Sequence, residues 1–353
     1  MKNFSLIIPA YKPDEKLLST LRSAVEAGLE DIIVIDDGGG EAFVPIFEQV
    51  KAISQCTLLV HEVNRGKGAA LKTAFAYVLE NRPDIQGVVT ADADGQHLTK
   101  DILAVGQKMM ESGCVTLGCR DFSGEDVPPR SRFGNRFTIG IFRLFFGMKI
   151  SDTQTGLRGF PRSVLAAFGA IQGDRYEYET NMLFYMSRNK MPLAEVTIQT
   201  VYIEENASSH FHPIRDSIRI YGMILKYLLS STAATVVDGL VFFLLKHFPF
   251  LGFLPLPLTF TAAFLARAIS SLVNFGLNAK VVFGDKISGK AMLRYYILAA
   301  VQIGISAAAV FAIEHLLVIK AAWLSTLIKL IVDTVLFFFS FRIQHKWVFN
   351  NEN

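Results

Sequence analysis

VVTADADGQH, residues 88–97, is an apolar run that ends in two carboxylates separated by one residue. Side chains at positions i and i+2 of an extended segment point the same way, so Asp92 and Asp94 converge just beyond the end of a strand. Oxygen ligands at this spacing suit Mg²⁺ or Mn²⁺, and such an ion takes its remaining ligands from substrate phosphates. Gln96 adds a neutral oxygen. A lone D-x-D is equally typical of an acidic turn that closes a strand, so the surrounding sequence has to decide.

The sequence around this stretch alternates between strands and helices. Apolar runs predict strands at residues 4–8, 31–37, 56–60 and 87–90, and periodic segments predict helices at residues 14–28 and 67–79. This alternation indicates an α/β domain with a mostly parallel sheet, in which ligands gather at the carboxyl ends of the strands. Asp37 and the pair Asp92 and Asp94 all follow such ends.

A glycine-rich turn, Gly66-Lys67-Gly68, precedes the second helix but lacks the spacing of a P-loop or a dinucleotide fingerprint. From the N-terminus of a helix the Lys67 ammonium could reach a phosphate. A plain helix-start turn fits the sequence equally well.

Composition divides the 353-residue chain into a polar and an apolar part. Residues 1–225 contain 24 Lys and Arg against 27 Asp and Glu, whereas residues 226–353 contain 11 against 5. The basic excess of the apolar part is expected at an anionic membrane surface, not on nucleic acid. The polar part begins with a strand, so we expect no signal peptide and a cytosolic location. Cys56, Cys114 and Cys119 show no metal-ligand spacing and are expected to be reduced thiols.

The apolar part predicts an all-α four-helix transmembrane domain over residues 227–349. Its four spans, each near the length of a bilayer crossing, are expected at residues 227–245, 256–279, 295–313 and 321–341. The linkers after the second and fourth spans are basic, which places both termini in the cytosol. Residues 274–283 and 340–349 echo each other and indicate two duplicated helical hairpins. Residues 212–226 have the spacing of a helix on the membrane surface, or of one packed on the first domain.

Three motifs in the first hundred residues resemble the nucleotide-sugar motifs of family 2 glycosyltransferases: IIPAY (7–11), VIDDG (34–38) and ADADGQH (91–97). The last has the form found in the polyprenyl-phosphate type, similar to dolichyl-phosphate mannose synthase. The resemblance implies a GT-A-type, Rossmann-like catalytic domain over residues 1–211. The apolar part resembles the GtrA-like four-span proteins.

This resemblance implies a donor site and a cofactor. Mg²⁺ or Mn²⁺ would be held on the diphosphate by Asp92, Asp94 and Gln96. With Lys67 added from its helix terminus, and His210 from a loop that touches the diphosphate in related synthases, the nucleotide-sugar site comprises Pro9, Tyr11, Asp37, Lys67, Asp92, Ala93, Asp94 and His210. The first and second motifs depart from the family at Lys12-Pro13 and Gly38-Gly39-Gly40, which leaves the identity of the base open.

Arginines next to the apolar segment 137–146 indicate an acceptor site, because arginine suits bidentate phosphate capture and an apolar helix suits a lipid tail. A solvated basic loop before a core helix would have the same composition. The family places acceptor-phosphate arginines at the positions that match Arg120 and Arg132, and Arg136 and Arg130 are second choices.

Two further acidic positions match family motifs. Asp152, in DTQTGLRGF (152–160), either orients the acceptor, acts as a base or caps a turn. A base is hardly required, because an acceptor phosphate is already ionised near pH 7. One acidic residue at the start of a predicted helix should face the site, and the sequence does not decide between Glu177 and Glu179.

The leading hypothesis is a metal-dependent, inverting hexosyltransferase of the cell membrane, with Asp94, Arg120, Arg132 and Asp152 as its catalytic residues. It would move one sugar from a nucleotide-sugar of the GDP-mannose or UDP-glucose type to a polyprenyl phosphate, such as undecaprenyl phosphate, at the cytosolic face. The alternative is a transporter that flips a lipid-linked sugar, with the first domain serving only for recognition. The metal motif favours the enzyme. The sequence leaves open whether the protein forms a homo-oligomer.

Overall fold

The computed structural model describes residues 3–122, 132, 135–136, 138–140, 142–199, 222–247, 258–284, 287–318 and 322–349. The chain divides into two compact units. The first unit contains all the strands of the described residues, and the second contains four long helices. The predicted boundary after residue 211, and most of the predicted surface helix 212–226, lie outside the described residues and stay predictions.

A seven-stranded sheet forms the first unit, in the order β3-β2-β1-β4-β6-β5-β7. Adjacent strands of the sheet are parallel, except that β6 runs antiparallel to both β4 and β5. The mostly parallel α/β fold is therefore confirmed. The strands are β1 (Phe4–Ala10), β2 (Ile32–Asp37), β3 (Cys56–His61), β4 (Gly87–Thr90), β5 (Val115–Arg120), β6 (Arg158–Pro161) and β7 (Leu193–Ile198).

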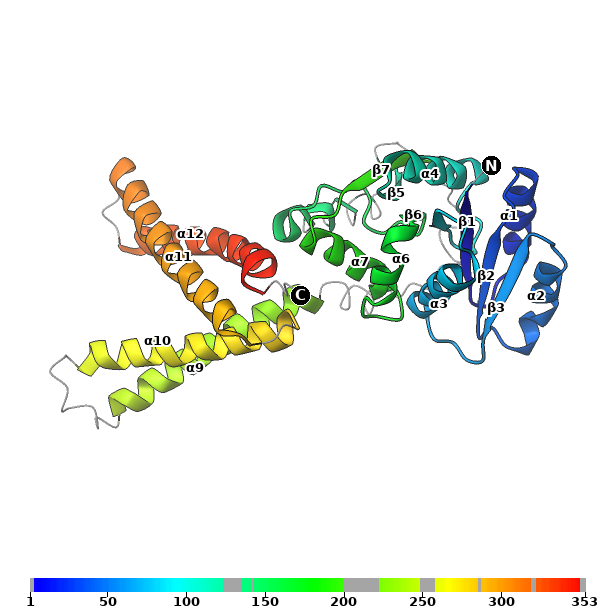
Figure 1. Ribbon diagram of the computed structural model, residues 1–353. Coiled ribbons are helices and arrows are strands. Elements are labelled where there is room, and N and C mark those ends of the chain that lie inside the picture. Colours follow the sequence, from blue (N-terminus) through cyan, green and yellow to red (C-terminus); the bar gives the residue numbers. More distant parts are fainter. Residues whose placement is uncertain are drawn as a thin grey trace. The chain divides into compact units, whose positions relative to one another are not determined.

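Helices cover both faces of this sheet, as the nearly continuous apolar strands require. On one face lie α1 (Glu15–Glu26), α2 (Val44–Lys51), which follows the short 3₁₀ turn η1 (Glu41–Phe43), and α4 (Thr99–Ser112). On the other lie α3 (Lys67–Asn81), α6 (Arg162–Gly169) and α7 (Glu177–Arg188) (Figure 1). Side chains of β1 at alternate positions pack on α1, where Leu17, Leu21 and Ala24 form the buried stripe.

The register of the sheet brings the sequence motifs to one edge. Ala10 of β1 pairs with Asp36 of β2, and Ile7 pairs with Thr90 at the end of β4. Because β6 is antiparallel to β4 and β5, it begins at the edge where those strands end, so the loop 152–157 that precedes β6 also lies there. The ends of β1, β2, β4 and β5 and the loop 152–157 therefore meet at one edge of the sheet, where ligands bind in folds of this kind.

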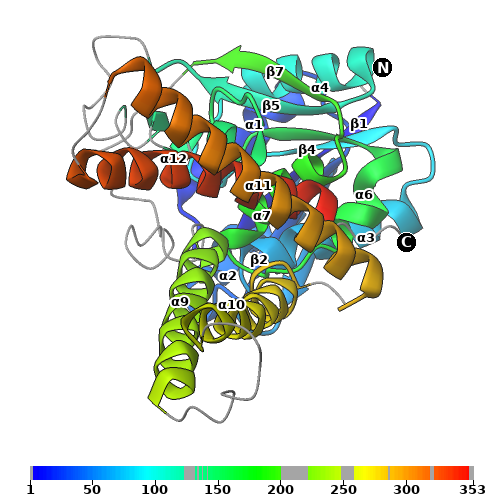
Figure 2. The same ribbon diagram turned by 90° about the vertical axis from the view of Figure 1, so that its left-hand side faces the viewer.

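The second unit consists of α9 (Gly222–His247), α10 (Leu258–Leu277), α11 (Gly289–Leu316) and α12 (Ala322–Ile343). Each of these helices overlaps one of the four predicted spans, and α9 runs beside α10 (Figures 1 and 2). Within the described residues, Leu225–Leu245 is the one stretch that is long and apolar enough to cross a membrane by length and composition alone. The number of spans stays a prediction.

The echo between the two hairpins has a structural counterpart. After α10 and after α12 the chain makes a π-helical turn, η4 (Asn278–Val282) and η5 (Gln344–Val348). The Asn278 side-chain amide donates to Gln344 Oε1 at 3.0 Å, and the rings of Phe283 and Phe349 stack at 5.0 Å between centroids. Equivalent positions of the two repeats thus contact each other, and all four of these side chains are buried.

Candidate active site

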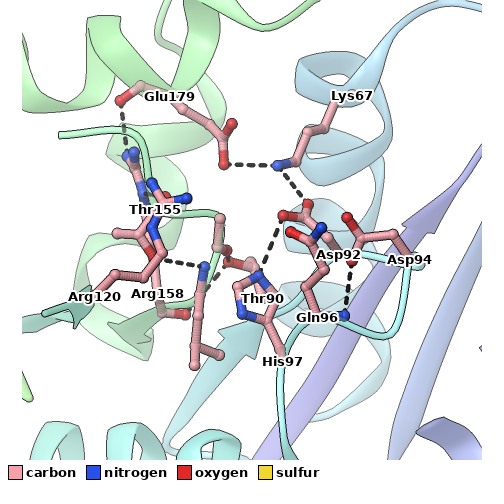
Figure 3. A network of polar contacts seen from close by, with 12 residues as sticks. Lys67, Thr90, Asp92, Asp94, Gln96, His97, Arg120, Thr155, Arg158 and Glu179 are labelled. Atoms are coloured by element: carbon pink, nitrogen blue, oxygen red, sulfur yellow. Dashed lines mark hydrogen bonds and ion pairs between the residues drawn. The ribbon is translucent and has the colours of Figure 1, made fainter. Parts of the chain in front are cut away.

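Asp92 and Asp94 lie on the turn that follows β4 (Figure 3). Gly95 adopts a φ of +76°, and the Gln96 backbone N–H donates to Asp94 Oδ1 at 3.0 Å, which closes the turn. Burial, and then the negative charge of Asp92, raises the pKa of Asp94. Two carboxylates with Ala93 between them are therefore held in an arrangement that a cation would stabilise.

Lys67, the first residue of α3, supplies a cation to this turn. Its Nζ lies 2.6 Å from Asp92 Oδ1 and 2.9 Å from Glu179 Oε1, between the two carboxylates (Figure 3). Burial on its own would lower the pKa of Lys67, but Asp92 and Glu179 outweigh it and raise that pKa. Burial would likewise raise the pKa of Asp92, but Lys67 and His97 hold it well below its usual range. Lys67 and Asp92 are thus a charged pair.

The glycines that flank Lys67 bring α3 against the start of α7. A Cβ on Gly68 would lie 2.6 Å from Tyr178 Cβ, and the Ala69 N–H donates to the Asp174 carbonyl at 3.0 Å. Lys72 also pairs with the Asp174 carboxylate at 2.9 Å. The glycine-rich turn therefore serves close helix packing, and this packing puts Lys67 within reach of Glu179.

The structure decides between the two glutamates of α7. Glu179 faces the site, where its carboxylate meets Lys67. Glu177 lies at the N-terminus of the helix, where Oε1 accepts from the backbone N–H groups of Asp174 and Arg175.

Asp37, at the end of β2, is buried and uses both of its carboxylate oxygens within the protein. Oδ1 lies 2.7 Å from His61 Nδ1 and accepts from the Arg65 N–H, and Oδ2 accepts from the Gly66 N–H at 2.8 Å and from the Asn64 amide at 3.0 Å. Asp37 thus fixes the turn that leads into Lys67. Its predicted contact with the nucleoside stays a prediction.

Pro9 and Tyr11 stand where β1 ends, next to β2 in the sheet. Both are half-buried, and the Lys12 ammonium lies 5.2 Å from the centre of the Tyr11 ring. Lys12 has a φ of +51°, so the chain turns sharply after the predicted nucleoside-binding pair.

Arg120, the last residue of β5, is clamped by Asp152. Its Nε and one terminal nitrogen donate to the two carboxylate oxygens at 2.7 and 3.1 Å, and its backbone N–H adds a longer contact of 3.3 Å. Asp152 is fully buried, whereas 28% of the Arg120 side chain is exposed. The Gln154 N–H also donates to Asp152, at 2.9 Å. This bidentate pair fixes the plane of the guanidinium.

The remaining predicted residues are less completely described. Arg132 is half-buried and Arg136 is exposed, each on a helical turn after β5. Asn135 ties this segment to the loop before Asp152 by donating to the Ser151 carbonyl at 3.1 Å. Arg130 and His210 lie outside the described residues.

Three residues that the sequence did not single out also shape the site. His97 Nε2 lies 3.2 Å from Asp92 Oδ2. Gly156 backs onto the same carboxylate, since a Cβ there would lie 2.3 Å from Asp92 Oδ2. Arg158 is buried and donates to the carbonyls of Thr155 and Glu179, which joins the loop before β6 to α7. His97 belongs to the quoted motif, but the approach of Gly156 leaves no signal in the sequence.

The carboxylate oxygens on the turn after β4 are suitable ligands for a divalent cation such as Mg²⁺ or Mn²⁺. No group of three His, Cys, Asp or Glu side chains suited to a metal occurs among the residues that the structure describes. Asp92 and Asp94 supply carboxylate oxygens side by side (Figure 3), and burial together with the negative charge of Asp92 raises the pKa of Asp94. Mg²⁺ and Mn²⁺ bind through one or two carboxylates when substrate phosphates complete their shell.

Comparisons with known proteins identify the families of both parts of the chain. Residues 5–169 match Glycosyl transferase family 2, and residues 226–349 match the GtrA/DPMS transmembrane domain. UDP-N-acetylglucosamine--dolichyl-phosphate N-acetylglucosaminyltransferase of Methanococcus voltae is 30% identical over 217 residues, which cover 56% of this chain and 86% of that protein. Dolichyl-phosphate beta-glucosyltransferase of Dictyostelium discoideum is 28% identical over 252 residues, which cover 64% of this chain and 75% of that protein.

The chain belongs to glycosyltransferase family 2 and carries a GtrA/DPMS transmembrane domain. It is a membrane protein and an enzyme of the dolichyl-phosphate sugar-transferase type with a nucleotide-sugar donor, which confirms the predicted family and class. Glucosyl-3-phosphoglycerate synthase from Mycobacterium tuberculosis, crystallised with Mn²⁺ and UDP, aligns with a TM-score of 0.48 and 15% identity over 65% of this chain and 79% of that one. A similarity this distant shows nothing about the donor or the metal here.

Proposed function

We propose that this protein transfers one sugar from a nucleotide-sugar to the phosphate of a polyprenyl lipid, in a reaction that depends on Mg²⁺ or Mn²⁺. The observation that carries the proposal is the arrangement at one edge of one sheet, where a carboxylate pair follows β4 and a clamped arginine ends β5. The carboxylates suit a metal on a donor diphosphate, and the arginine suits an acceptor phosphate.

The donor half of the site would be built from the turn after β4, the N-terminus of α3 and the ends of β1 and β2. Asp92, Asp94 and Gln96 would hold the metal ion, which would neutralise the charge that develops on the leaving diphosphate. Lys67, at the N-terminus of α3, is a second cation within reach of the same turn. Tyr11, with Pro9 and Asp37, would border the nucleoside at the ends of β1 and β2.

In the acceptor half, Arg120 and Arg132 would hold the lipid phosphate. A phosphate oxygen then attacks the anomeric carbon, and the bond from that carbon to the donor diphosphate breaks, so the nucleoside diphosphate leaves with the electron pair and the configuration inverts. No proton has to be removed, because the phosphate is already ionised. The two oxygens of Asp152 are engaged by Arg120 and by the Gln154 N–H, which supports a positioning role over a role as base.

The names of two relatives support one class of nucleotide-sugar as the donor. One relative is named for UDP-N-acetylglucosamine and another for a glucosyl group. We therefore favour a UDP-linked sugar of the glucose type over GDP-mannose. Dolichyl phosphate in both names supports a polyprenyl phosphate as the acceptor.

The membrane domain would hold the acceptor at the depth of the site. We propose that α9, α10, α11 and α12 all cross the membrane, with both termini and the catalytic domain in the cytosol. The match to a transmembrane domain and the basic residues that follow the second and fourth predicted spans (Lys280 and Lys286, and Arg342 and Lys346) support this topology. The lipid tail would stay in the bilayer while its phosphate meets Arg120, and this tethering raises the effective concentration of the acceptor.

The experiment that tests this proposal is a donor panel. Purified full-length protein in nanodiscs containing undecaprenyl or dolichyl phosphate is incubated with UDP-glucose, UDP-N-acetylglucosamine or GDP-mannose, and lipid products are read by mass spectrometry. We expect one donor to add a single sugar to the lipid phosphate. Arg120→Ala should impair use of the lipid and leave nucleotide binding in calorimetry nearly unchanged. A ladder of products carrying several sugars, or no lipid product with any donor, would count against the proposal.

A further inference from the structure

Both oxygens of the predicted metal ligand Asp92 are engaged by nitrogen atoms of the protein. Lys67 Nζ lies 2.6 Å from Oδ1, and His97 Nε2 lies 3.2 Å from Oδ2. A divalent ion that ligates Oδ1 would have to share this oxygen with an ammonium at contact distance. Since like charges repel most strongly where water is largely excluded, the two cations cannot both bind Asp92 well. The side chains of Lys67 and Asp92 are 15% and 31% exposed, so solvent screens this repulsion only in part.

The backbone on both sides of Lys67 is held by hydrogen bonds. Asp37 holds the N–H groups of Arg65 and Gly66, and Ala69 is tied to the loop before α7. The freedom that remains is in the four-carbon side chain, whose ammonium is also held by Glu179 at 2.9 Å. Lys67 can therefore release Asp92 by rotating its side chain while Glu179 keeps the ammonium near the site.

We propose that Lys67 is a built-in competitor of the divalent metal for Asp92, and that the donor diphosphate removes this competition by drawing the ammonium onto its own phosphate oxygens. This inference rests on the proposed function, since it takes Asp92 to be a metal ligand and a diphosphate to be the guest. An ammonium at the N-terminus of a helix is well placed for phosphate. Metal and donor then bind cooperatively, and by linkage each raises the affinity of the protein for the other.

Competition between Lys67 and the metal ion for Asp92 has a functional consequence. A site that holds Mg²⁺ or Mn²⁺ weakly without the donor assembles its cation centre only when the diphosphate is present. Lys67 then stabilises the diphosphate from one side while Asp92 and Asp94 present the metal from another. The same side chain thus neutralises Asp92 in the empty enzyme and a phosphate in the loaded one, so the site always contains a compensating charge.

The test is the affinity for Mn²⁺ without nucleotide, measured on the full-length protein from the electron paramagnetic resonance signal of free Mn²⁺. Lys67→Met should bind Mn²⁺ about tenfold more tightly than the wild type or better, because the competing cation is gone. Lys67→Arg, which retains the charge, should bind it as weakly as the wild type. If Lys67→Met does not fold, Lys67→Gln removes the charge and keeps a hydrogen-bond donor for Asp92. Its Mn²⁺ affinity is then compared in the same way.

The matched control is Lys16→Met. Lys16 packs its side-chain carbons beside Gly95 and pairs with Asp14 at 3.3 Å, so its removal changes the net charge near the turn by the same amount without touching Asp92. We expect its Mn²⁺ affinity to change less than about twofold. Equal gains in Lys67→Met and Lys16→Met would overturn the inference, as would no gain in Lys67→Met.

This outcome is separable from failure of the proposed function. If the wild type forms a lipid-linked sugar in a metal-dependent way but Lys67→Met shows no gain in Mn²⁺ affinity, the inference alone is wrong. If the wild type binds no Mn²⁺ even with UDP or GDP present, the metal site itself is wrong and both fall.

Discussion

The pair Arg120 and Asp152 makes the sharpest prediction about the acceptor site. Two charge-assisted hydrogen bonds of 2.7 and 3.1 Å join a fully buried carboxylate to a guanidinium that is 28% exposed. Removing one member of a buried ion pair costs about 3–5 kcal/mol, and the partial exposure of Arg120 reduces this to about 2 kcal/mol. If Asp152 acts only by aiming Arg120, removing Asp152 should impair use of the acceptor only while Arg120 is present.

The assay is a double-mutant cycle on kcat/KM for the lipid acceptor, with Arg120→Ala, Asp152→Ala and the double variant. Each single variant should lose about 10- to 100-fold, since one charged hydrogen bond is worth about 1.5–3 kcal/mol. The double variant should lose little more than the worse single variant. Arg120→Lys cannot form the fork and should behave like Arg120→Ala. Losses that multiply in the double variant would refute the positioning role, and a bell-shaped pH profile lost in Asp152→Ala would indicate a base.

Three further predictions concern the catalytic unit. Burial raises the pKa of the Cys56 thiol to about 11, so alkylation by iodoacetamide at pH 8 should be about 100-fold slower than for an unperturbed cysteine; peptide mapping that shows ordinary reactivity would contradict this. Asp37→Asn leaves backbone donors poorly satisfied and should destabilise the protein by about 2–4 kcal/mol, seen as a lower thermal midpoint, and an unchanged midpoint would be evidence against its anchoring role. The added methyl group of Gly156→Ala would collide with the Asp92 carboxylate, so this variant should transfer sugar more than about tenfold more slowly than the wild type. Gly169→Ala, which adds a methyl group in open space, should transfer sugar at the wild-type rate, and equal rates for the two variants would show that Gly156 is not part of the site.

The parts of the fold that depend on local pattern could be predicted from the sequence. The runs at β1, β2 and β4 are apolar and end at polar turn residues, so their positions and the edge where Asp92 and Asp94 gather follow from periodicity and strand direction. The antiparallel entry of β6 between β4 and β5 does not follow, because Arg158–Pro161 acquires its register only from its two neighbours. An alternating strand–helix pattern carries no sign of this insertion.

The contacts of the site also divide into those that could be predicted from the sequence and those that could not. The carboxylate pair could be predicted because it directly follows an apolar strand and lies in the motif ADADGQH. The ion pair between Lys67 and Glu179 depends on how closely α3 packs against α7. Gly68 permits this close packing, but a glycine in the sequence does not predict it. The approach of Gly156 to Asp92 likewise exists only in three dimensions.

We propose that Asp92 and Asp94 hold a metal on the donor during transfer to a polyprenyl phosphate. This transfer is measured by following a radiolabelled sugar from its nucleotide into the lipid phase of proteoliposomes, with EDTA, with Mn²⁺ or Mg²⁺ restored, and with Asp94→Asn. We predict that EDTA abolishes lipid labelling, that either metal restores it, and that Asp94→Asn, while folded, labels at least about 100-fold more slowly under all conditions. Full labelling in EDTA, or undiminished labelling by Asp94→Asn, would contradict the account.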